Sequence, residues 1–382
     1  MNVNGHKAEV SETAGAAGPG AGRHAEPGAR SGRAASRRRS SASIHDVAAA
    51  AGVSYQTVSR VINDHPNVKP STRELVLATI KDLGFRPSRT ARALAGGRPE
   101  SVTVLTSNTT LYGYAAALQG IEEAARAAGF AVGVRVVEAG AHAVVRDAVA
   151  RAVEPGAALI VIAFDEAGTE ALAAVPRDVP LAAVVDASWS CEGRDKPWAW
   201  IDDREAASDA TRYLLELGHK TVHCVAIPSP ARPSQRTVGW RSALTAADLP
   251  VPEPLQADWY PGSGYGIGQV LARDPDVTAV LCGNDDLALG VIRAMHEAGR
   301  KVPDDVSIVG FDDTPHSLYY TPPLTTVRMD FTELGRVCFA LLRQQVHPAS
   351  AALPSWPRAE LIIRESTGPL PRWSQAAARR AG

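Results

Sequence analysis

Short β-rich runs alternate with amphipathic stretches from residue 101 to residue 365. This pattern restricts the fold more than any other feature, because strands that alternate with helices build a mostly parallel sheet with helices on both faces. More than ten such elements follow one another, which predicts an α/β body of two lobes with doubly wound parallel sheets. The clearest predicted strands lie at 102–106, 131–137, 159–163, 182–186, 222–227, 279–282 and 307–311, and the clearest predicted helices at 115–128, 144–152, 204–217, 287–298 and 332–345.

Composition and motifs exclude several classes of protein. No apolar run reaches the roughly 18 residues of a membrane-spanning helix, and the N-terminal region has no apolar segment typical of a secretion signal. The four cysteines (Cys191, Cys224, Cys282 and Cys338) are too scattered for a zinc site or a disulfide framework and fit a reducing cytoplasm. The glycine-rich phosphate loops, HExxH helix and GxSxG elbow of common enzymes are missing. We therefore expect a cytoplasmic protein that is not an enzyme and has no metal, cofactor or membrane partner.

Charge is divided unevenly along the chain. Residues 1–98 carry 15 Lys and Arg against 7 Asp and Glu, a net charge of +8, whereas the remainder carries 25 against 34, a net charge of −9. A basic N-terminal part on an acidic body predicts that the N-terminal part binds a polyanion, although a basic solvated tail would give the same balance. Residues 1–42 are rich in Gly, Ala, Ser and Arg without apolar periodicity, and we predict a disordered basic tail there.

Residues 43–87 have the pattern of a small all-α helix-turn-helix domain. Ser43 followed by Asp46 forms a capping-box pattern that opens a first short helix, and Gly52 ends this helix after two turns. A second helix follows the glycine directly. Another capping-box pattern at 71–74 predicts the start of a third helix.

The second predicted helix of this domain carries large polar side chains opposite its apolar face. Gln can pair bidentately with adenine and Arg with guanine in the major groove, so this stripe predicts base readout, with an ordinary solvated helix face as the alternative. Residues near the N-terminus of the helix are placed for phosphate contacts. The residues predicted to contact bases are Tyr55, Gln56, Ser59 and Arg60, and those predicted to contact phosphates are Ser54, Thr57 and Asn63.

The run IHDVAAAAGVSYQTVSRVIN at 44–63 resembles the headpiece of the LacI/GalR family of bacterial transcription regulators. The match continues through NVKPSTR at 67–73 and LGFRP at 83–87, so it is a dense pattern of over forty residues. In that family the next segment is a hinge helix that enters the minor groove and wedges a leucine between base pairs, and residues 88–97 match it. The residues so implied are Arg89 for a phosphate contact, Ala91 for the close approach of two copies and Leu94 for the wedge.

The resemblance extends to about Ser366 and implies that residues 101–366 are a sugar-sensing and dimerisation body with the fold of periplasmic binding proteins. The matching ligand positions lie at strand ends or in the loops that follow. Carboxylates, Asn and Arg suit sugar hydroxyls, and Trp and Phe suit the apolar face of a sugar ring, although each residue alone could equally cap a helix or fill the core. The ligand-binding residues so implied are Ser107, Tyr112, Asp186, Arg236, Trp259, Asn284, Asp312 and Phe331.

Together these features predict a sugar-responsive transcriptional repressor that binds a pseudopalindromic double-stranded operator as a homodimer and is released by a small carbohydrate. The alternative is a sugar-binding protein of the transport type, against which the headpiece and the missing secretion signal argue. Residues 367–382 contain no heptad repeat, so we predict a disordered tail and a dimer rather than a tetramer. The identity of the sugar, and whether it induces or co-represses, stay open at this point.

Overall fold

The computed structural model describes residues 42–62, 65–85, 101–138, 140, 142–153, 156–186, 197–230, 233–348 and 355–370. The chain divides into two compact units, residues 1–86 and 87–382, which we call the headpiece and the body and treat separately. Some predictions concern residues outside the described ranges: the hinge helix at 88–97 with Arg89, Ala91 and Leu94, the phosphate contact of Asn63, and most of both predicted tails.

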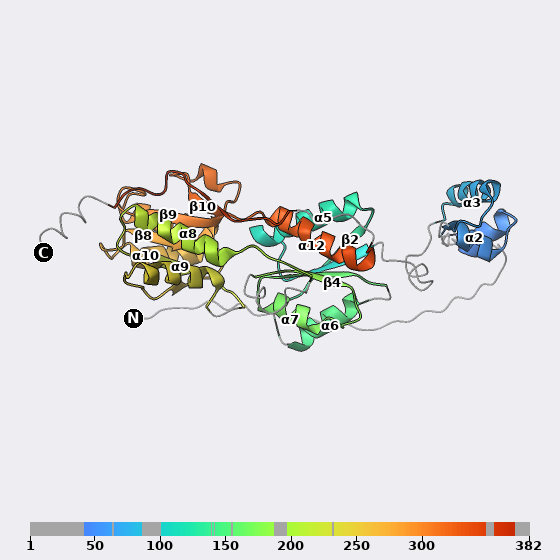
Figure 1. The fold of residues 1–382 in the computed structure, drawn as a ribbon, viewed down its shortest axis with the longest axis horizontal. Coiled ribbons are helices and arrows are strands. Elements are labelled where there is room, and N and C mark those ends of the chain that lie inside the picture. The colour runs from blue at the N-terminus through green and yellow to red at the C-terminus, as the bar shows by residue number, and fades with distance from the viewer. Residues whose placement is uncertain are drawn as a thin grey trace, which may run out of the picture. The chain divides into compact units, whose positions relative to one another are not determined.

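The headpiece consists of three helices, α1 (Ile44–Ala50), α2 (Tyr55–Ile62) and α3 (Pro70–Asp82) (Figure 1). The predicted capping box opens α1: the Ser43 hydroxyl oxygen accepts from the Asp46 amide at 3.3 Å, and the Asp46 carboxylate accepts from the Ser43 amide at 2.8 Å. Gly52 adopts a φ of +63°, which glycine tolerates at little cost, and the chain turns there into α2. The buried side chains of the headpiece are Val47, Ala48, Ala51, Val58, Val61 and Val76.

Helix α3 begins before the capping box that the sequence predicts. Its first residue is Pro70, and the preceding Lys69 makes no side-chain capping hydrogen bond. The predicted start at 71–74 is therefore wrong. Proline opens a helix well because its fixed φ suits the first turn and its missing amide would have no partner there.

The first lobe of the body is a parallel sheet of five strands in the order β2-β1-β3-β4-β5. Neighbouring residues on β3 point to opposite faces, so Ile160 packs in the core on one side and Val161 in the core on the other. Helices α5 and α12 cover the first face and α6 and α7 the second (Figure 1). The elements are β1 (Ser101–Thr106), α5 (Tyr112–Ala127), β2 (Ala131–Val136), α6 (His142–Ala152), β3 (Leu159–Ala163), α7 (Glu166–Ala174), β4 (Leu181–Val185), β5 (Trp198–Ala199) and α12 (Phe331–Val346).

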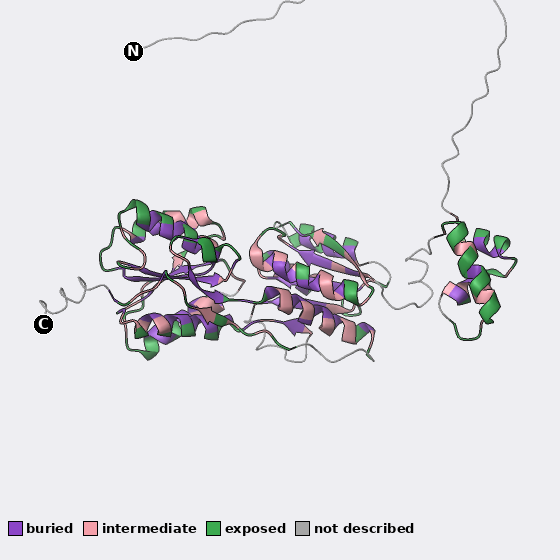
Figure 2. Cartoon of the chain, turned by 90° about the horizontal axis from the view of Figure 1, so that it is seen from above, coloured by how far each residue is buried: buried purple, intermediate pink, exposed green. Residues whose placement is uncertain are grey.

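The second lobe has six strands in the order β11-β10-β9-β8-β6-β7, of which only the β10–β11 pair is antiparallel. Helices α8 and α9 cover one face, where Trp240 of α9 is fully buried, and α10 and α11 cover the other. Figure 2 shows the buried residues concentrated in the sheets and on the inner faces of the helices. The elements are α8 (Asp203–Glu216), β6 (His223–Ala226), α9 (Gln235–Ala246), β7 (Leu255–Gln256), α10 (Pro261–Leu271), β8 (Ala279–Cys282), α11 (Asp285–Glu297), β9 (Ser307–Asp312), the 3₁₀ turn η2 (Ser317–Tyr319), β10 (Thr325–Arg328) and β11 (Glu360–Ile362).

The chain passes between the two lobes three times, after β5, after β10 and after α12. Two of these crossings contact each other. The rings of Trp200 and Trp356 lie 5.1 Å apart edge to face, and the Trp356 indole donates to the Trp200 carbonyl at 2.8 Å. The two lobes are thus joined by three connections, two of which contact each other.

The C-terminal tail, predicted to begin at residue 367, is ordered in its first four residues. Residues 367–370 pack on the second lobe: the Leu370 amide donates to the Leu217 carbonyl at 2.9 Å, and Leu370 is buried. The prediction of disorder is wrong for these four residues, because a single apolar side chain and short polar contacts are too weak a pattern to detect in the sequence.

Candidate functional site

The exposed face of helix α2 carries the side chains that the sequence predicts for base readout. Val58 and Val61 are buried in the headpiece core, whereas Tyr55, Gln56 and Arg60 are exposed. Ser59 is half-buried. Three long polar side chains on one exposed face can reach base edges in a major groove, which admits an α-helix.

Ser54 and Thr57, predicted to contact phosphates, cap α2. The Ser54 hydroxyl oxygen accepts from the Thr57 amide at 3.1 Å, and the two hydroxyl oxygens lie 2.9 Å apart. A hydroxyl has one donor and two acceptor positions. Ser54 or Thr57 can therefore donate to a phosphate only with a hydroxyl hydrogen that the bond between the two hydroxyls does not use.

A ring contact that the sequence analysis missed lies on the same surface. The imidazole of His45, in α1, stacks on the Tyr55 ring with centroids 5.1 Å apart and planes 18° apart. The two residues lie on different helices, so no helical spacing in the sequence points to the pair.

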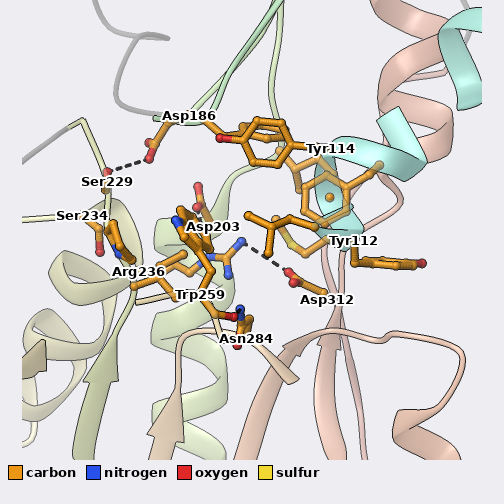
Figure 3. Close-up of a pocket in the computed structure, with 18 of the residues that line it drawn as sticks. Tyr112, Tyr114, Asp186, Asp203, Ser229, Ser234, Arg236, Trp259, Asn284 and Asp312 are labelled. Carbon is orange, nitrogen blue, oxygen red and sulfur yellow. Dashed lines mark hydrogen bonds and ion pairs between the residues drawn. The ribbon is translucent and has the colours of Figure 1, made fainter. Parts of the chain in front are cut away.

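A pocket lies between the two lobes of the body (Figure 3). The first lobe contributes side chains from the starts of α5 and α12 and from the end of β4, and the second lobe contributes the end of β9 and the first turns of α9 and α11. The free space is about 70 Å³, so the lining side chains nearly fill it. Seven of the eight predicted ligand residues line this pocket: Tyr112, Asp186, Arg236, Trp259, Asn284, Asp312 and Phe331.

Arg236 is the electrostatic centre of the pocket. Its Nε lies 3.3 Å from a carboxylate oxygen of Asp203, and its Nη2 lies 3.5 Å from Oδ1 of Asp312. Nη1 donates to the Gly283 carbonyl, and the guanidinium lies 4.5 Å from the centroid of the Phe311 ring. These contacts hold one cation between two buried carboxylates, so the guanidinium offsets the charge of only one of them when both are ionised.

Burial changes the proton affinity of both carboxylates. Burial, and next the charge of Asp186, raises the pKa of Asp203 to about 7, against the effect of Arg236. Burial raises the pKa of Asp312 to about 6, again opposed by Arg236. Among the described residues, Oδ1 of Asp203 and Oδ1 of Asp312 are buried and accept no hydrogen bond. Such oxygens are ready acceptors for a ligand hydroxyl.

The backbone at the end of β9 is strained where it presents Asp312. Asp312 has a φ of 104° and Asp313 a φ of 53°, and residues other than glycine rarely adopt such angles. Arg364 and Arg328 both bind the Asp313 carboxylate, at 2.5 and 2.8 Å. Strain of about 1–3 kcal/mol persists only where the surroundings hold it, and it is concentrated at binding sites.

Asn284 supports the pocket as a helix cap. Its Oδ1 accepts from the Leu287 amide at 2.8 Å, and its Nδ2 donates to the Trp259 carbonyl at 3.1 Å, so it joins two parts of the pocket wall. The next residue, Asp285, is fully buried and accepts from the Thr314 amide at 2.7 Å and the Thr326 hydroxyl at 2.5 Å. Asp285 therefore holds the loop after β9 and strand β10 against the start of α11, behind the pocket wall.

Ser107 is the one predicted ligand residue that does not line the pocket, and its contact with a ligand stays a prediction. Its hydroxyl donates to the Asp165 carboxylate at 2.5 Å, and the same carboxylate accepts from the Gly168 amide at the start of α7. The neighbouring carboxylate takes the one hydrogen that the Ser107 hydroxyl can donate, so the hydroxyl can still accept but cannot donate to a ligand. Ser107 instead fixes the loop after β3.

Several residues that line the pocket are not predicted from the sequence as ligand residues. Asp203 is the most important, because it shares Arg236 with Asp312, yet in the sequence it looks like one of two acids that open α8. Phe164 packs against the Phe331 ring, with centroids 5.7 Å apart. The missed polar residues are Asp203, Ser229, Ser234, Asp286 and Thr314, and the missed apolar residues include Tyr114, Phe164, Ile201, Ile227 and Met329.

A helix-turn-helix headpiece joined to a two-lobed body with a buried interlobe pocket defines a class, the ligand-responsive DNA-binding regulators. Comparison with known proteins agrees. Residues 43–88 match the family model of bacterial regulatory proteins, lacI family, and residues 211–367 match the periplasmic binding protein-like domain.

The chain is 33% identical to catabolite control protein A of Priestia megaterium over 80% of this chain and 92% of that protein. It is 32% identical to the transcriptional repressor PurR of Pectobacterium carotovorum subsp. carotovorum over 80% of this chain and 90% of that protein. The lac repressor dimer solved with operator and the anti-inducer ONPF superposes with a TM-score of 0.74 at 30% identity, covering 86% of this chain and all of that one. The chain belongs to the LacI family and is a DNA-binding transcriptional repressor, not an enzyme.

A further structure, the regulator CelR in complex with cellobiose, superposes with a TM-score of 0.60 at 28% identity, covering 85% of this chain and 99% of that one. Within the described ranges, no helix is long and apolar enough to cross a membrane. The same ranges contain no group of three or more His, Cys, Asp or Glu placed to hold a metal ion.

Proposed function

We propose that this repressor binds a pseudopalindromic operator as a dimer and that a small neutral carbohydrate in the interlobe pocket releases it. The observation that carries the choice of ligand is the Asp203–Arg236–Asp312 arrangement, in which two buried carboxylate oxygens accept no hydrogen bond within the described structure. Vicinal hydroxyls of a sugar can donate to both carboxylates and accept from the guanidinium between them.

Charge and shape support a neutral sugar over an anionic one. Four carboxylates line the pocket, those of Asp186, Asp203, Asp286 and Asp312, and Arg236 is the one Lys or Arg among its described lining residues. A phosphate or carboxylate would meet this acidic surface at a high cost. The rings of Trp259, Phe331 and Tyr112 offer apolar faces on which a sugar ring can stack.

The DNA side of the proposal rests on the exposed α2 face. One headpiece reads one half-site, so a pseudopalindromic operator requires a two-fold pair of headpieces. The lac repressor, similar over most of this chain, was solved as a dimer on its operator. Tyr55, Gln56, Ser59 and Arg60 would read bases, the segment 88–97 would form the hinge, and the protein would act in the cytoplasm, where the DNA is.

Ligand binding and lobe movement are coupled in this proposal. A free space of about 70 Å³ is below the roughly 300–1,000 Å³ of most ligand pockets, so a sugar ring fits only when the lobes shift. The sugar then changes operator affinity because it binds two arrangements of the lobes with different affinity.

A purine base is the second candidate. The relatives named PurR, at about a third identity, favour it, and a planar base could lie between the aromatic rings of the pocket. The base has fewer hydroxyl-like donors than a sugar for the two carboxylate oxygens that accept no hydrogen bond in the described structure, which is why we rank it second.

The test is a calorimetric screen of the purified full-length protein against neutral sugars, sugar phosphates, hypoxanthine and guanine, followed by operator release measured by fluorescence anisotropy. We expect a neutral sugar to bind and to release the operator. Release by a purine, with no binding of any neutral sugar, would overturn the sugar assignment and leave the repressor assignment in place.

A further inference from the structure

Two tryptophans lie in the segments that connect the lobes. Trp200 directly follows β5 and opens the crossing 200–202, which leads from the first lobe into α8. Trp356 lies shortly before β11, in the crossing that runs from α12 of the first lobe to the second lobe. Any rotation of one lobe against the other has to turn the backbone of these connections, so a contact between two of them opposes such a rotation.

The contact holds the backbone of Trp200 as well as its ring. The ring centroids lie 5.1 Å apart with their planes at 62°, and the indole Nε1 of Trp356 donates to the Trp200 carbonyl oxygen at 2.8 Å. This hydrogen bond fixes the peptide plane that follows Trp200. Because β5 ends at Ala199 and the Asp202 side chain caps α8, the first crossing can change direction only through torsions within 200–202. Such a change turns the carbonyl away from the indole and breaks the bond.

The two tryptophans are anchored in different lobes. Trp200 packs against the first-lobe core that lies under α6 and α7. The segment of Trp356 continues into β11, whose Leu361 lies opposite Val327 of β10 in the sheet of the second lobe. The contact therefore ties a side chain held by one lobe to a segment held by the other.

The exposure of Trp356 distinguishes this contact from a core contact. Trp240 makes the same kind of bond, from its indole to the Val222 carbonyl at 2.8 Å, but its side chain is fully buried, so breaking that bond would uncover a core. Trp356 is 38% exposed and can leave Trp200 without opening a core. An edge-to-face ring pair and one hydrogen bond are each of modest strength, so the contact can form and break reversibly.

The crossing that the contact holds also forms part of the pocket wall. Ile201 and Asp203 line the pocket, and Asp203 lies 3.3 Å from Nε of Arg236. Torsions that free the Trp200 carbonyl also displace these two side chains. Opening of the contact and a change in the shape of the pocket therefore occur together.

We propose that Trp200 and Trp356 form a latch, which stabilises the arrangement of the lobes seen here and opens when the lobes rotate. The latch acts in the ligand-free protein and does not depend on the identity of the effector, so it goes beyond the proposed function. An effector that binds a different arrangement of the lobes has to overcome the latch. The latch thereby sets part of the free-energy difference between the two arrangements.

The experiment measures the distance between the lobes by double electron–electron resonance on the full-length protein without any ligand. Spin labels are attached at Arg146→Cys on α6 and Arg293→Cys on α11, both at exposed positions. All proteins carry Cys191→Ser, because the other three cysteines are buried. Excess unlabelled protein limits the signal to pairs of labels within one chain.

Two variants remove the latch in steps. Trp356→Phe keeps an aromatic ring and loses the indole N–H, and Trp356→Ala loses both. We expect the ratio of molecules in a second arrangement to molecules in the arrangement seen here to rise about two- to tenfold in Trp356→Phe and about five- to a hundredfold in Trp356→Ala. The matched control is Tyr265→Phe, which removes a hydrogen bond to Glu297 between two helices of the second lobe and should leave the distances unchanged.

The same distance distribution in wild type and in both Trp356 variants overturns the latch, and so does an equal change with Tyr265→Phe. If Trp356→Ala does not fold, Trp356→Phe alone decides. Because no ligand is added, this result leaves the sugar assignment untouched, and a screen in which no sugar binds leaves the latch untouched.

Discussion

The DNA-binding surface of the headpiece and the ligand pocket of the body expose their side chains to very different degrees. Tyr55 on α2 is 48% exposed, whereas the side chains of Arg236 and Asp312 are 11% and 13% exposed. A duplex is large enough to dock on a convex helix face, so the headpiece needs only one helix and a few long side chains. A small effector must be surrounded, so its site needs elements from both lobes and charges balanced away from water.

The largest expected effect comes from removing the cation of the buried site. Arg236→Ala leaves Asp203 and Asp312 buried without a counter-charge, so we expect sugar affinity to fall at least about a hundredfold, in line with the loss of one partner of a buried ion pair. Operator binding should survive, because the headpiece folds around its own core. Anisotropy with operator and increasing sugar measures both.

Arg293→Ala, an exposed arginine paired with Glu297, is the control and should release the operator as wild type does. If Arg236→Ala also releases the operator at the wild-type sugar concentration, Arg236 does not bind the sugar and the ligand site is not the buried pocket.

A substitution on the exposed DNA-binding face of α2 should cause a smaller loss of affinity, confined to one base pair of the operator. Gln56→Ala removes one bidentate base contact, so we expect it to cost about 1–3 kcal/mol on the preferred operator and to flatten base preference at one position. Binding-site selection with the variant measures this. Lys81→Ala, on α3, should leave base preference unchanged, and an unaltered consensus with Gln56→Ala would remove α2 from base readout.

The buried carboxylates predict a pH dependence of stability. The pKa of Asp203 is raised to about 7 by burial, so between its unfolded value near 4 and about 7 the folded state holds a proton that the unfolded state has lost. Stability therefore rises as the pH falls from 8 to 6, and the midpoint of thermal unfolding should rise by a few degrees.

Asp203→Asn should reduce this rise, and the remainder comes from Asp285 and Asp312, whose pKa values burial raises to about 8 and about 6. Asp209→Asn, a change at an exposed residue of the same helix, should leave the rise unaltered. Scanning calorimetry of the full chain in buffers of matched ionic strength follows the effect. The same pH dependence in wild type and in Asp203→Asn would show that the Asp203 carboxyl does not hold the additional proton in the folded protein.

The smallest effect concerns the ring pair of the headpiece. His45→Ala removes the stack that holds the Tyr55 ring, and an aromatic pair of this kind contributes about 0.5–1.5 kcal/mol. Operator affinity should fall by that amount, and His45→Phe should restore it because the stack is kept. Equal losses in both variants, measured by anisotropy, would point to a direct contact of the imidazole with DNA.

The parts of the fold that follow from local pattern could be predicted from the sequence. β3 and β8 have the predicted bounds, and the ends of the other predicted strands and helices differ by a few residues. The seven pocket residues found in advance came from a family resemblance, because each one alone looks like a cap or a core residue. Ser107 follows a strand end, as predicted from the sequence, but its hydroxyl donates to the Asp165 carboxylate and it does not line the pocket. The sequence pattern could not predict this contact, because the two residues are far apart in the chain.

Features that depend on neighbours a few residues away could be predicted from the sequence alone. The Ser43–Asp46 capping box closes over three residues, and the turn at Gly52 and the polar stripe of α2 are equally local. The contact of Asp203 with Arg236, 33 residues further on, and the ion pair of Arg236 with Asp312 at the end of β9 depend on the tertiary structure. Spacing along the chain does not predict them, because it is packing that brings the first turns of α8 and α9 to the end of β9. Burial at that place then raises the pKa values of both carboxylates.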